Sequence, residues 1–216
     1  MEQIYAEGKR KYYINSLKGK IYITNLLNKK MFCTKDFIDI SYESKNIIVK
    51  SLSTPFPHDF TFHGIKIRSV EGFLQSLKYK DEQTKQHLIN CYGSEACFVG
   101  ASNFDEDLQY EGNLYFEGKK IDRYDIEYQE LLNELYLSLC SNSTFENSLK
   151  ATGDRELLYS SGIEDPTKTL LTSREFADRL KIIRNAILLD KNPKNRLAEL
   201  SDKIAEDYYQ KNYANN

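Results

Sequence analysis

The sequence predicts an α+β fold that is predominantly helical, with short N-terminal strands and one β-hairpin. Short runs in the first fifty residues alternate apolar and polar side chains, as half-buried strands do. From residue 69 onward, apolar residues recur instead at helical spacing. The chain has 216 residues, of which 40% are hydrophobic and 29% charged, which is the composition of a globular protein with its own core.

Strands are predicted where apolar and polar residues alternate over short runs. The runs in the N-terminal part span residues 21–24, 37–41 and 46–50. Further along, residues 60–62 and 65–67 flank His63 and Gly64, a pair typical of the tight turn of a β-hairpin. We therefore expect several short strands and one hairpin before the helical part of the chain begins.

Helices are predicted where apolar residues fall three and four positions apart. Such stripes cover residues 70–77, 128–139, 176–187 and 197–208. Asp125 is placed as the N-cap of the second stripe, and Thr172 with Glu175 forms a capping box before the third. Residues 143–146 match the same capping pattern and open a short helix that Gly153 can terminate.

The helix predicted over residues 69–78 carries two stripes of different character. Its apolar stripe consists of Val70, Phe73, Leu74 and Leu77. Glu71, Gln75 and Lys78 fall on a second stripe, about a quarter turn away. A carboxylate, an amide and an amine thus line up beside the core, where the edge of a pocket would lie.

Composition and charge argue against several classes of protein. The formal net charge of −2 argues against broad electrostatic binding to nucleic acid or to an anionic membrane. No apolar run reaches transmembrane length, and the N-terminus lacks the apolar core of a signal peptide. The four cysteines contain no CxxC pair, and with only three histidines no cluster has zinc spacing. We therefore expect a cytoplasmic protein with reduced thiols, no cofactor, no metal and no membrane association.

The chain shows no internal repeat and no long linker. Residues 1–46 are expected to form a strand-rich extension packed on the main domain, which spans residues 47–190. A C-terminal helix with a polar tail covers residues 191–216. The extension is a candidate contact surface for a toxin or another partner.

Four segments rich in small residues interrupt the regular patterns. They cover residues 53–59, 93–103, 151–154 and 160–172. Small residues allow a ligand to approach the backbone closely, although each segment alone is also typical of a turn or a helix cap. None is a Walker loop or a dinucleotide-binding fingerprint.

Taken in order, these segments and the helix at 69–78 form one pattern. Its positions are Leu52-Ser53-Thr54-Pro55, Phe60 and Gly64, then Ser69, Glu71, Gln75 and Lys78, then Gly93, Ala96 and Gly100, and finally Ala151-Thr152-Gly153, Leu157, Asp165, Leu171-Thr172, Glu175-Phe176 and Ile183-Arg184. The pattern resembles the NADAR family of NAD- and ADP-ribose-associated proteins, from about residue 47 to residue 189. The resemblance implies the YbiA-like helical fold.

The resemblance also implies an N-glycosidase whose transition state carries positive charge at the anomeric carbon of ribose. Glu71 would stabilise that charge or activate the attacking water. Lys78 would attack the anomeric carbon as a neutral amine, or would hold a phosphate or the carboxylate as a cation. Asp165 would be the second carboxylate, with Glu164 as the alternative register. The implied substrate-binding positions are Ser53, Thr54, Gln75, Gly100, Thr152, Gly153 and Phe116.

Three functions follow from this resemblance. The first is removal of ADP-ribose from modified guanine in nucleic acid, counteracting a toxin or other ADP-ribosyltransferase. The second is cleavage of ribosyl-phosphate intermediates of the riboflavin pathway. The third is a non-catalytic module that binds ADP-ribose or a related nucleotide, which is favoured by Ala101 and by the absence of tryptophan from the chain. In each case Tyr115, Phe116 or Tyr124 would supply the aromatic surface of the pocket in place of tryptophan.

Purely structural interpretations stand beside these roles. Glu71 can act as a charge at a helix start, and Lys78 can pair with Asp81 or Glu82. Arg184 is expected to tie helices together rather than to contact a substrate.

Overall fold

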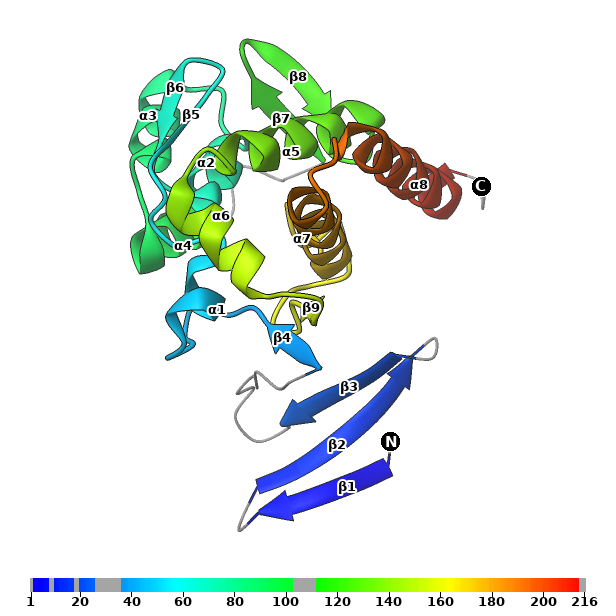
Figure 1. Cartoon of the computed structure of the whole chain (residues 1–216). Helices are drawn as coiled ribbons and strands as arrows, with labels where there is room; N and C mark the ends of the chain where they lie inside the picture. The colour runs from blue at the N-terminus through cyan, green and yellow to red at the C-terminus, as the bar shows by residue number, and fades with distance from the viewer. Residues whose placement is uncertain (1, 8–9, 18–19, 26–35, 103–111, 214–216) are drawn as a thin grey trace.

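The computed structural model describes residues 2–7, 10–17, 20–25, 36–102 and 112–213, and the side chains of residues 36–98 and 112–210. These residues form the α+β fold that the sequence predicts, with eight helices and nine short strands (Figure 1). Within the same part of the chain, no helix combines the length and the apolar character that crossing a bilayer requires.

The strands form four small sheets. The N-terminal strands β1 (Glu2–Glu7), β2 (Arg10–Leu17) and β3 (Lys20–Asn25) make an antiparallel sheet of their own. Two hairpins follow, one of β5 (Phe60–Phe62) and β6 (Ile65–Ile67), the other of β7 (Asn113–Phe116) and β8 (Lys119–Asp122). The last pair is parallel and joins β4 (Phe37–Asp39) to β9 (Glu156–Leu158), with Ile38 opposite Leu157.

The helices make up most of the main body. They are α1 (Ile47–Ser51), α2 (Val70–Ser76), α3 (Glu82–Ile89), α4 (Gly93–Ser102), α5 (Ile126–Leu139), α6 (Ser143–Ala151), α7 (Ser173–Leu188) and α8 (Lys194–Tyr213). Helix α5 packs against α7, α8 and the β5–β6 hairpin, and α7 contacts α6, α8 and β9 (Figure 1). Most of the apolar side chains of these elements belong to one buried core cluster, and a second, smaller cluster on α8 consists of Leu200, Ile204 and Tyr208.

Most of the predicted caps are present. Asp125 caps α5, and Thr172 forms with Glu175 the predicted capping box of α7. Ser69, which was not predicted as a cap, also begins a helix, because its hydroxyl accepts from the backbone N–H of Gly72 at the start of α2. Gly153 has φ +62°, the left-handed conformation that favours glycine just after a helix end.

The predicted hairpin at residues 60–67 is also confirmed. His63 and Gly64 both have positive φ, +47° and +77°, as the tightest hairpin turns require. The β7–β8 hairpin was not predicted. Its turn places Glu117 and Gly118 at φ +48° and +73°, and glutamate carries no strong turn signal.

Two local predictions were wrong. Residues 46–50 are not a strand, because the side chain of Asn46 accepts from the N–H of Ile48 at 3.0 Å and caps the short helix α1. The Ser51 hydroxyl then bonds Ser148 of α6 at 2.6 Å, so tertiary packing favours a helix where the apolar pattern is ambiguous. Helix α6 is capped one residue earlier than predicted, by Asn142, whose side chain accepts from two backbone N–H groups.

The predicted domain boundaries, at residues 46/47 and 190/191, separate segments that contact each other in the structure. Strand β4 falls within the segment assigned to an extension, yet it pairs with β9, and Ile38 lies in the core. Helix α8 falls within the C-terminal segment, and its Ser201 accepts a hydrogen bond from Asn133 of α5 at 2.8 Å. Both pieces are tied to the 47–190 region by buried contacts.

A fully buried polar network stands at the centre of the helical layer. The Arg123 guanidinium donates two hydrogen bonds to the Glu175 carboxylate, at 2.9 and 2.7 Å. Gln129 donates to the same carboxylate at 2.6 Å, and Arg179 donates to the Gln129 side-chain oxygen at 2.7 Å. Because every member is paired, the network links α5, α7 and the end of β8 into one rigid unit.

Candidate functional site

A cavity of about 170 Å³ lies beside α2 and is open to solvent on one side. One wall comes from Thr54 and from the polar stripe of α2, and the other from the segment between β9 and α7. The lining residues are Thr54, Glu71, Leu74, Gln75, Tyr159, Ser161, Gly162, Ile163, Thr169, Leu170 and Leu171.

Helix α2 is held rigidly against its neighbours. The Ser69 hydroxyl donates to the backbone carbonyl of Cys91 at 2.8 Å, beyond the end of α3. Gly72 packs so closely on α3 that an added Cβ would clash with the carbonyl oxygen of Leu88. The backbone N–H of Glu71 donates to the Thr54 carbonyl at 2.9 Å, so the start of α2 and the Thr54 loop share one frame.

The Glu71 carboxylate faces the cavity and is fixed by two neutral donors. The Thr54 hydroxyl donates to its Oε2 at 2.7 Å, and the Gln75 amide donates to its Oε1 at 2.8 Å. A carboxylate can accept about four hydrogen bonds, so lone pairs remain for a ligand or a water molecule. The carboxylate is therefore oriented without being saturated by these two donors.

Lys78 acts on this carboxylate through Gln75. Its ammonium donates to the Gln75 side-chain oxygen at 2.5 Å, which leaves the amide nitrogen to face Glu71. An ammonium can only donate, so its charged form dictates the orientation of the amide. Burial lowers the pKa of Lys78 to about 8, and the nearby Glu71 charge opposes that shift. Lys78 is not part of the cavity lining.

The opposite wall of the cavity is the segment that directly follows β9, beginning with Tyr159. The backbone N–H of Ser160 donates to the buried Asp39 carboxylate of β4 at 3.1 Å. Burial, followed by the nearby charge of Glu71, raises the pKa of Tyr159 to about 12, so this phenol stays protonated. Tyr136 of α5 is fully buried, and its hydroxyl has no hydrogen-bond partner in the described part of the chain. Two phenolic hydroxyls thus lie within electrostatic range of Glu71.

The buried network of α5 and α7 holds the remaining part of this wall. Arg123 donates to the Thr169 carbonyl at 3.2 Å, and the Tyr128 hydroxyl donates to the Leu170 carbonyl at 2.6 Å. These bonds fix the backbone of residues 169–171, whose side chains line the cavity. The wall is therefore positioned by the same residues that stabilise the fold.

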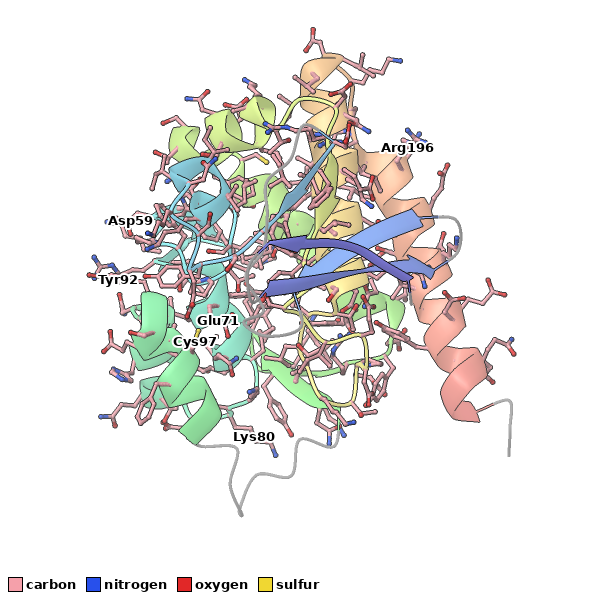
Figure 2. All side chains as sticks on the ribbon, turned by 90° about the horizontal axis from the view of Figure 1, so that it is seen from below. Asp59, Glu71, Lys80, Tyr92, Cys97 and Arg196 are labelled. Atoms are coloured by element: carbon pink, nitrogen blue, oxygen red, sulfur yellow. The ribbon has the colours of Figure 1, made fainter. Side chains whose placement is uncertain are left out.

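Four of the predicted site residues come together. Thr54, Glu71 and Gln75 line the cavity, and Lys78 reaches it through Gln75. Figure 2 shows Glu71 beside Cys97, which lies on the neighbouring helix α4. Glu71 also raises the pKa of Cys97, after burial as the larger cause, to about 11.

Five predicted site residues do not line the cavity, because their side chains or, for Gly153, the backbone stabilise the fold. The hydroxyls of Ser53 and Thr152 bond carbonyls one turn earlier, and Gly153 terminates α6. Phe116 is buried among Phe62, Phe73 and His63 in the core.

Asp165 is the fifth of these residues. Its carboxylate accepts from Thr167 and pairs with Lys168 within its own loop, and these bonds, with that of the Thr167 hydroxyl first, lower its pKa. The alternative Glu164 is not among the residues that line the cavity either. Gly100 lies within α4, and its surroundings fall outside the described residues.

Tyr159 is the aromatic residue that the sequence did not reveal. It directly precedes the predicted segment 160–172, but only the pairing of β9 with β4 turns it toward α2. The aromatic candidates that were predicted lie elsewhere: Tyr115 packs under Lys80, and Tyr124 packs against Tyr208. Arg184 ties α7 to the end of α6, as predicted, by donating to the hydroxyl of its C-cap Thr152 at 3.3 Å, and it also donates to the carbonyl of Arg155 before β9 at 2.6 Å.

Comparison with known proteins identifies the family. The model of the family described as Bacteriophage protein GP30.3 matches residues 46–185. The chain belongs to this family. An uncharacterized 17.1 kDa protein from the Gp30–rIII intergenic region of Enterobacteria phage T4 is 30% identical over 131 residues, which cover 59% of this chain and 84% of that protein. No solved structure was found to match the chain.

The predicted resemblance to the NADAR family is therefore wrong, since the matching model is that of GP30.3. The structure shows why the pattern misled. Ser69 caps α2, Thr172 and Glu175 form the capping box of α7, and Gly153 ends α6. Helices of many folds use these residue types at these places. The function has to be argued from the chemistry of the cavity instead.

Proposed function

We propose that the Glu71 cavity is the active site of an N-glycosidase that hydrolyses the bond between a ribosyl group and a nitrogen base. The observation that carries this proposal is an anionic side chain on the cavity wall, fixed by Thr54 and Gln75 and still able to accept further hydrogen bonds. A carboxylate held in this way is suited to a reaction in which positive charge develops on the substrate.

The reaction requires little else from the protein. As the glycosidic bond breaks, positive charge spreads over the anomeric carbon and ring oxygen, and Glu71 stabilises it. The base leaves with the electron pair of the broken bond. A water molecule then adds to the anomeric carbon, and the proton that the water loses is taken up by the base. The aromatic face of Tyr159 supports the sugar or the base, and Leu170 with Leu171 excludes water from one side.

Lys78 serves as a positioning residue in this scheme. Its ammonium fixes the Gln75 amide, and the amide fixes the Glu71 carboxylate. The direct attack by a neutral lysine that was considered from the sequence finds less support, because Gln75 stands between Lys78 and the carboxylate and Lys78 does not line the cavity. A lysine that acts through another side chain should influence the rate chiefly through its charge.

The size of the cavity favours a single ribosyl unit as the buried part of the substrate. A volume of about 170 Å³ is smaller than the roughly 300–1,000 Å³ typical of whole-ligand pockets. The remainder of a conjugate would extend through the open side, which suits a nucleotide, an ADP-ribosyl group or a modified base in nucleic acid.

The test compares substrates as well as variants. The full chain is incubated with an oligonucleotide that carries ADP-ribosylated guanine, with free ADP-ribosylated nucleosides and with a ribosyl-phosphate pyrimidine of the riboflavin pathway. The expected products are free ADP-ribose from the oligonucleotide or the nucleosides, or free base from the ribosyl-phosphate pyrimidine. Glu71→Gln should reduce the rate of release by about a hundredfold or more. Glu130→Gln, which changes an exposed glutamate of α5, is the matched control.

Two results would overturn the proposal. Turnover retained by Glu71→Gln would remove the carboxylate from the mechanism. Absence of product from all three conjugates, together with calorimetric binding of ADP-ribose that requires Glu71, would favour a binding module.

A further inference from the structure

A second group of chemically reactive side chains lies behind α2, at the corner between α3 and α4. His87 lies in the last turn of α3, Cys91 in the short link after it, and Glu95 in the first turn of α4. One nitrogen, one sulfur and one carboxylate oxygen from these residues all lie within 4.8 Å of one another. The distance between His87 Nε2 and Cys91 Sγ is 3.9 Å.

These distances are close to those of a tetrahedral zinc site. Bonds of about 2.3 Å to sulfur and about 2.0–2.2 Å to nitrogen and oxygen place neighbouring ligand atoms roughly 3.3–3.7 Å apart. His87 and Glu95 have exposed side chains that can close the small remaining gap, whereas Cys91 is buried and fixed. Only side-chain movement is needed to complete such a site.

The backbone around Cys91 is already held in place. Its N–H donates to the Leu88 carbonyl at 2.9 Å, and its own carbonyl accepts from the Ser69 hydroxyl at 2.8 Å. Gly93, with φ +62°, turns the chain into α4 and donates to the Pro55 carbonyl at 2.7 Å. A ligand set on a rigid backbone loses little conformational entropy when it binds a metal.

We propose that His87, Cys91 and Glu95 bind a divalent zinc ion, with water as the fourth ligand. A thiolate and a carboxylate neutralise the two charges of the ion, and imidazole with thiolate favours zinc over magnesium or calcium. In the structure the Cys91 thiol donates a hydrogen bond to the His87 carbonyl at 3.3 Å. When zinc binds, the thiol gives up this bond and releases its proton to the solvent.

The ion would brace the base of the Glu71 cavity. The Cys91 carbonyl holds Ser69, the N-cap of the helix that carries Glu71. Zinc at this corner should therefore stabilise α2 without contacting the cavity. The sequence did not reveal this site, because the prediction rested on the spacing of cysteine and histidine alone. The third ligand of this group, Glu95, is a carboxylate.

The test uses the full chain, freed of metal with a chelator and titrated with Zn²⁺ and with Co²⁺. One equivalent of Co²⁺ should produce a thiolate-to-metal charge-transfer band, and Zn²⁺ should displace it. His87→Gln and Glu95→Gln change exposed side chains and should each weaken binding by about tenfold or more. Cys91→Ser should abolish the band, while Cys97→Ser, on the same helix as Glu95, should retain it.

Thermal unfolding gives a second readout. At the same Zn²⁺ concentration, the unfolding temperature of the wild type and of Cys97→Ser should rise more than that of His87→Gln, whose weaker binding gives a smaller shift. The proposal is overturned if His87→Gln binds zinc as tightly as the wild type, if the band survives in Cys91→Ser, or if it is lost in Cys97→Ser. None of these outcomes depends on glycosidase activity.

Discussion

Glu175 and Glu71 occupy comparable positions near the starts of two helices, and their surroundings differ in one decisive respect. The four hydrogen bonds to Glu175 come from Arg123, which gives two, from Gln129 and from the backbone N–H of Thr172. Glu71, in contrast, receives two bonds from neutral side chains and faces a cavity. The hydrogen-bonding capacity of the Glu175 carboxylate is used by other groups of the protein. The Glu71 carboxylate can still accept hydrogen bonds from a ligand or a water molecule in the cavity.

The charges around the two carboxylates differ as well. Burial alone would raise the pKa of Glu175, but Arg123 and then Arg179 hold it below its ordinary value. The cation nearest to Glu71 in its hydrogen-bond chain is Lys78, one amide away. A carboxylate surrounded by guanidinium groups is a structural element, while one held by an alcohol and an amide remains available to a cationic transition state.

The largest expected effect comes from Glu175→Gln. Glutamine can still serve a capping box, so the variant removes chiefly the charge that compensates the buried Arg123. We expect a loss of about 3–5 kcal/mol in the free energy of unfolding, measured by urea denaturation. Thr172→Ser, which keeps the capping hydroxyl, should remain close to the wild type. A loss below about 1 kcal/mol for Glu175→Gln would mean that the pair is not essential.

The same substitution at Glu71 should reverse the balance between stability and activity. Glu71→Gln keeps the size of the side chain, and the Lys78 ammonium keeps its hydrogen bond to Gln75, so the free energy of unfolding should change by about 1 kcal/mol or less. Glycosidase activity should nevertheless fall by about a hundredfold or more. Parallel denaturation and turnover measurements check this contrast, which fails if the two quantities decline together.

Lys78→Met tests the chain of hydrogen bonds behind Glu71. Loss of one charge-assisted bond of roughly 1.5 kcal/mol corresponds to about a tenfold lower rate. In the wild type the rate should decline above about pH 8, where the Lys78 ammonium loses its proton. The variant should lack this decline. A wild-type rate that stays constant from pH 7 to 9.5 would exclude a role for the hydrogen-bond chain from Lys78 through Gln75 to Glu71.

The stability of the wild type should change with pH in the opposite direction. Lys78 has a folded pKa of about 8, below its ordinary value of 10.5, so between these values the unfolded chain binds more protons than the folded one. The free energy of unfolding should therefore rise with pH across this window, relative to Lys78→Met. Denaturation curves at pH 7.5 and 10 measure the difference.

The smallest effect is expected at the tip of the β5–β6 hairpin. His63 lies between Glu117 and Glu134, at 3.0 and 3.1 Å, and its hydrogen bond to Glu134 is the main cause of its raised pKa. The charged form adds stability that is fully present below the ordinary pKa of 6.5 and is lost as pH rises through the folded value.

Because this cluster is exposed, solvent screening should keep the contribution of His63 below about 1 kcal/mol. His63→Asn is the suitable variant, since asparagine tolerates the positive φ of this position. Unfolding of the two proteins at pH 5.5 and 8.5 should show a pH-dependent difference. An identical difference at both pH values would show that His63 contributes no charge.

Local chemistry explains what the sequence could predict. The caps at Asp125 and Thr172 and the turn at His63 depend on neighbouring residues alone, and the structure contains all three. The polar stripe of α2 belongs to the same class, because helical spacing alone places Glu71 and its partners on one face.

Contacts between distant segments explain what the sequence could not predict. Tyr159 reaches the cavity through the pairing of β9 with β4, and Phe116 is drawn into the core by Phe62 and Phe73. The Asp165 carboxylate accepts a hydrogen bond from the Thr167 hydroxyl within its own loop. A list of matching positions does not show which side chains already cap a helix or pack in the core. For this reason the assignment to the NADAR family by motif was also wrong.

The parallel pairing of β4 with β9 has a consequence for the order of folding. The two strands come from opposite halves of the chain, so closing this pair is entropically costlier than forming the local helices. The cavity wall at Tyr159 follows directly after β9 and is pinned by Asp39 at the end of β4. We expect helices α5 to α7 to associate first and β4 to dock late, so that the cavity takes shape only when the chain has otherwise folded.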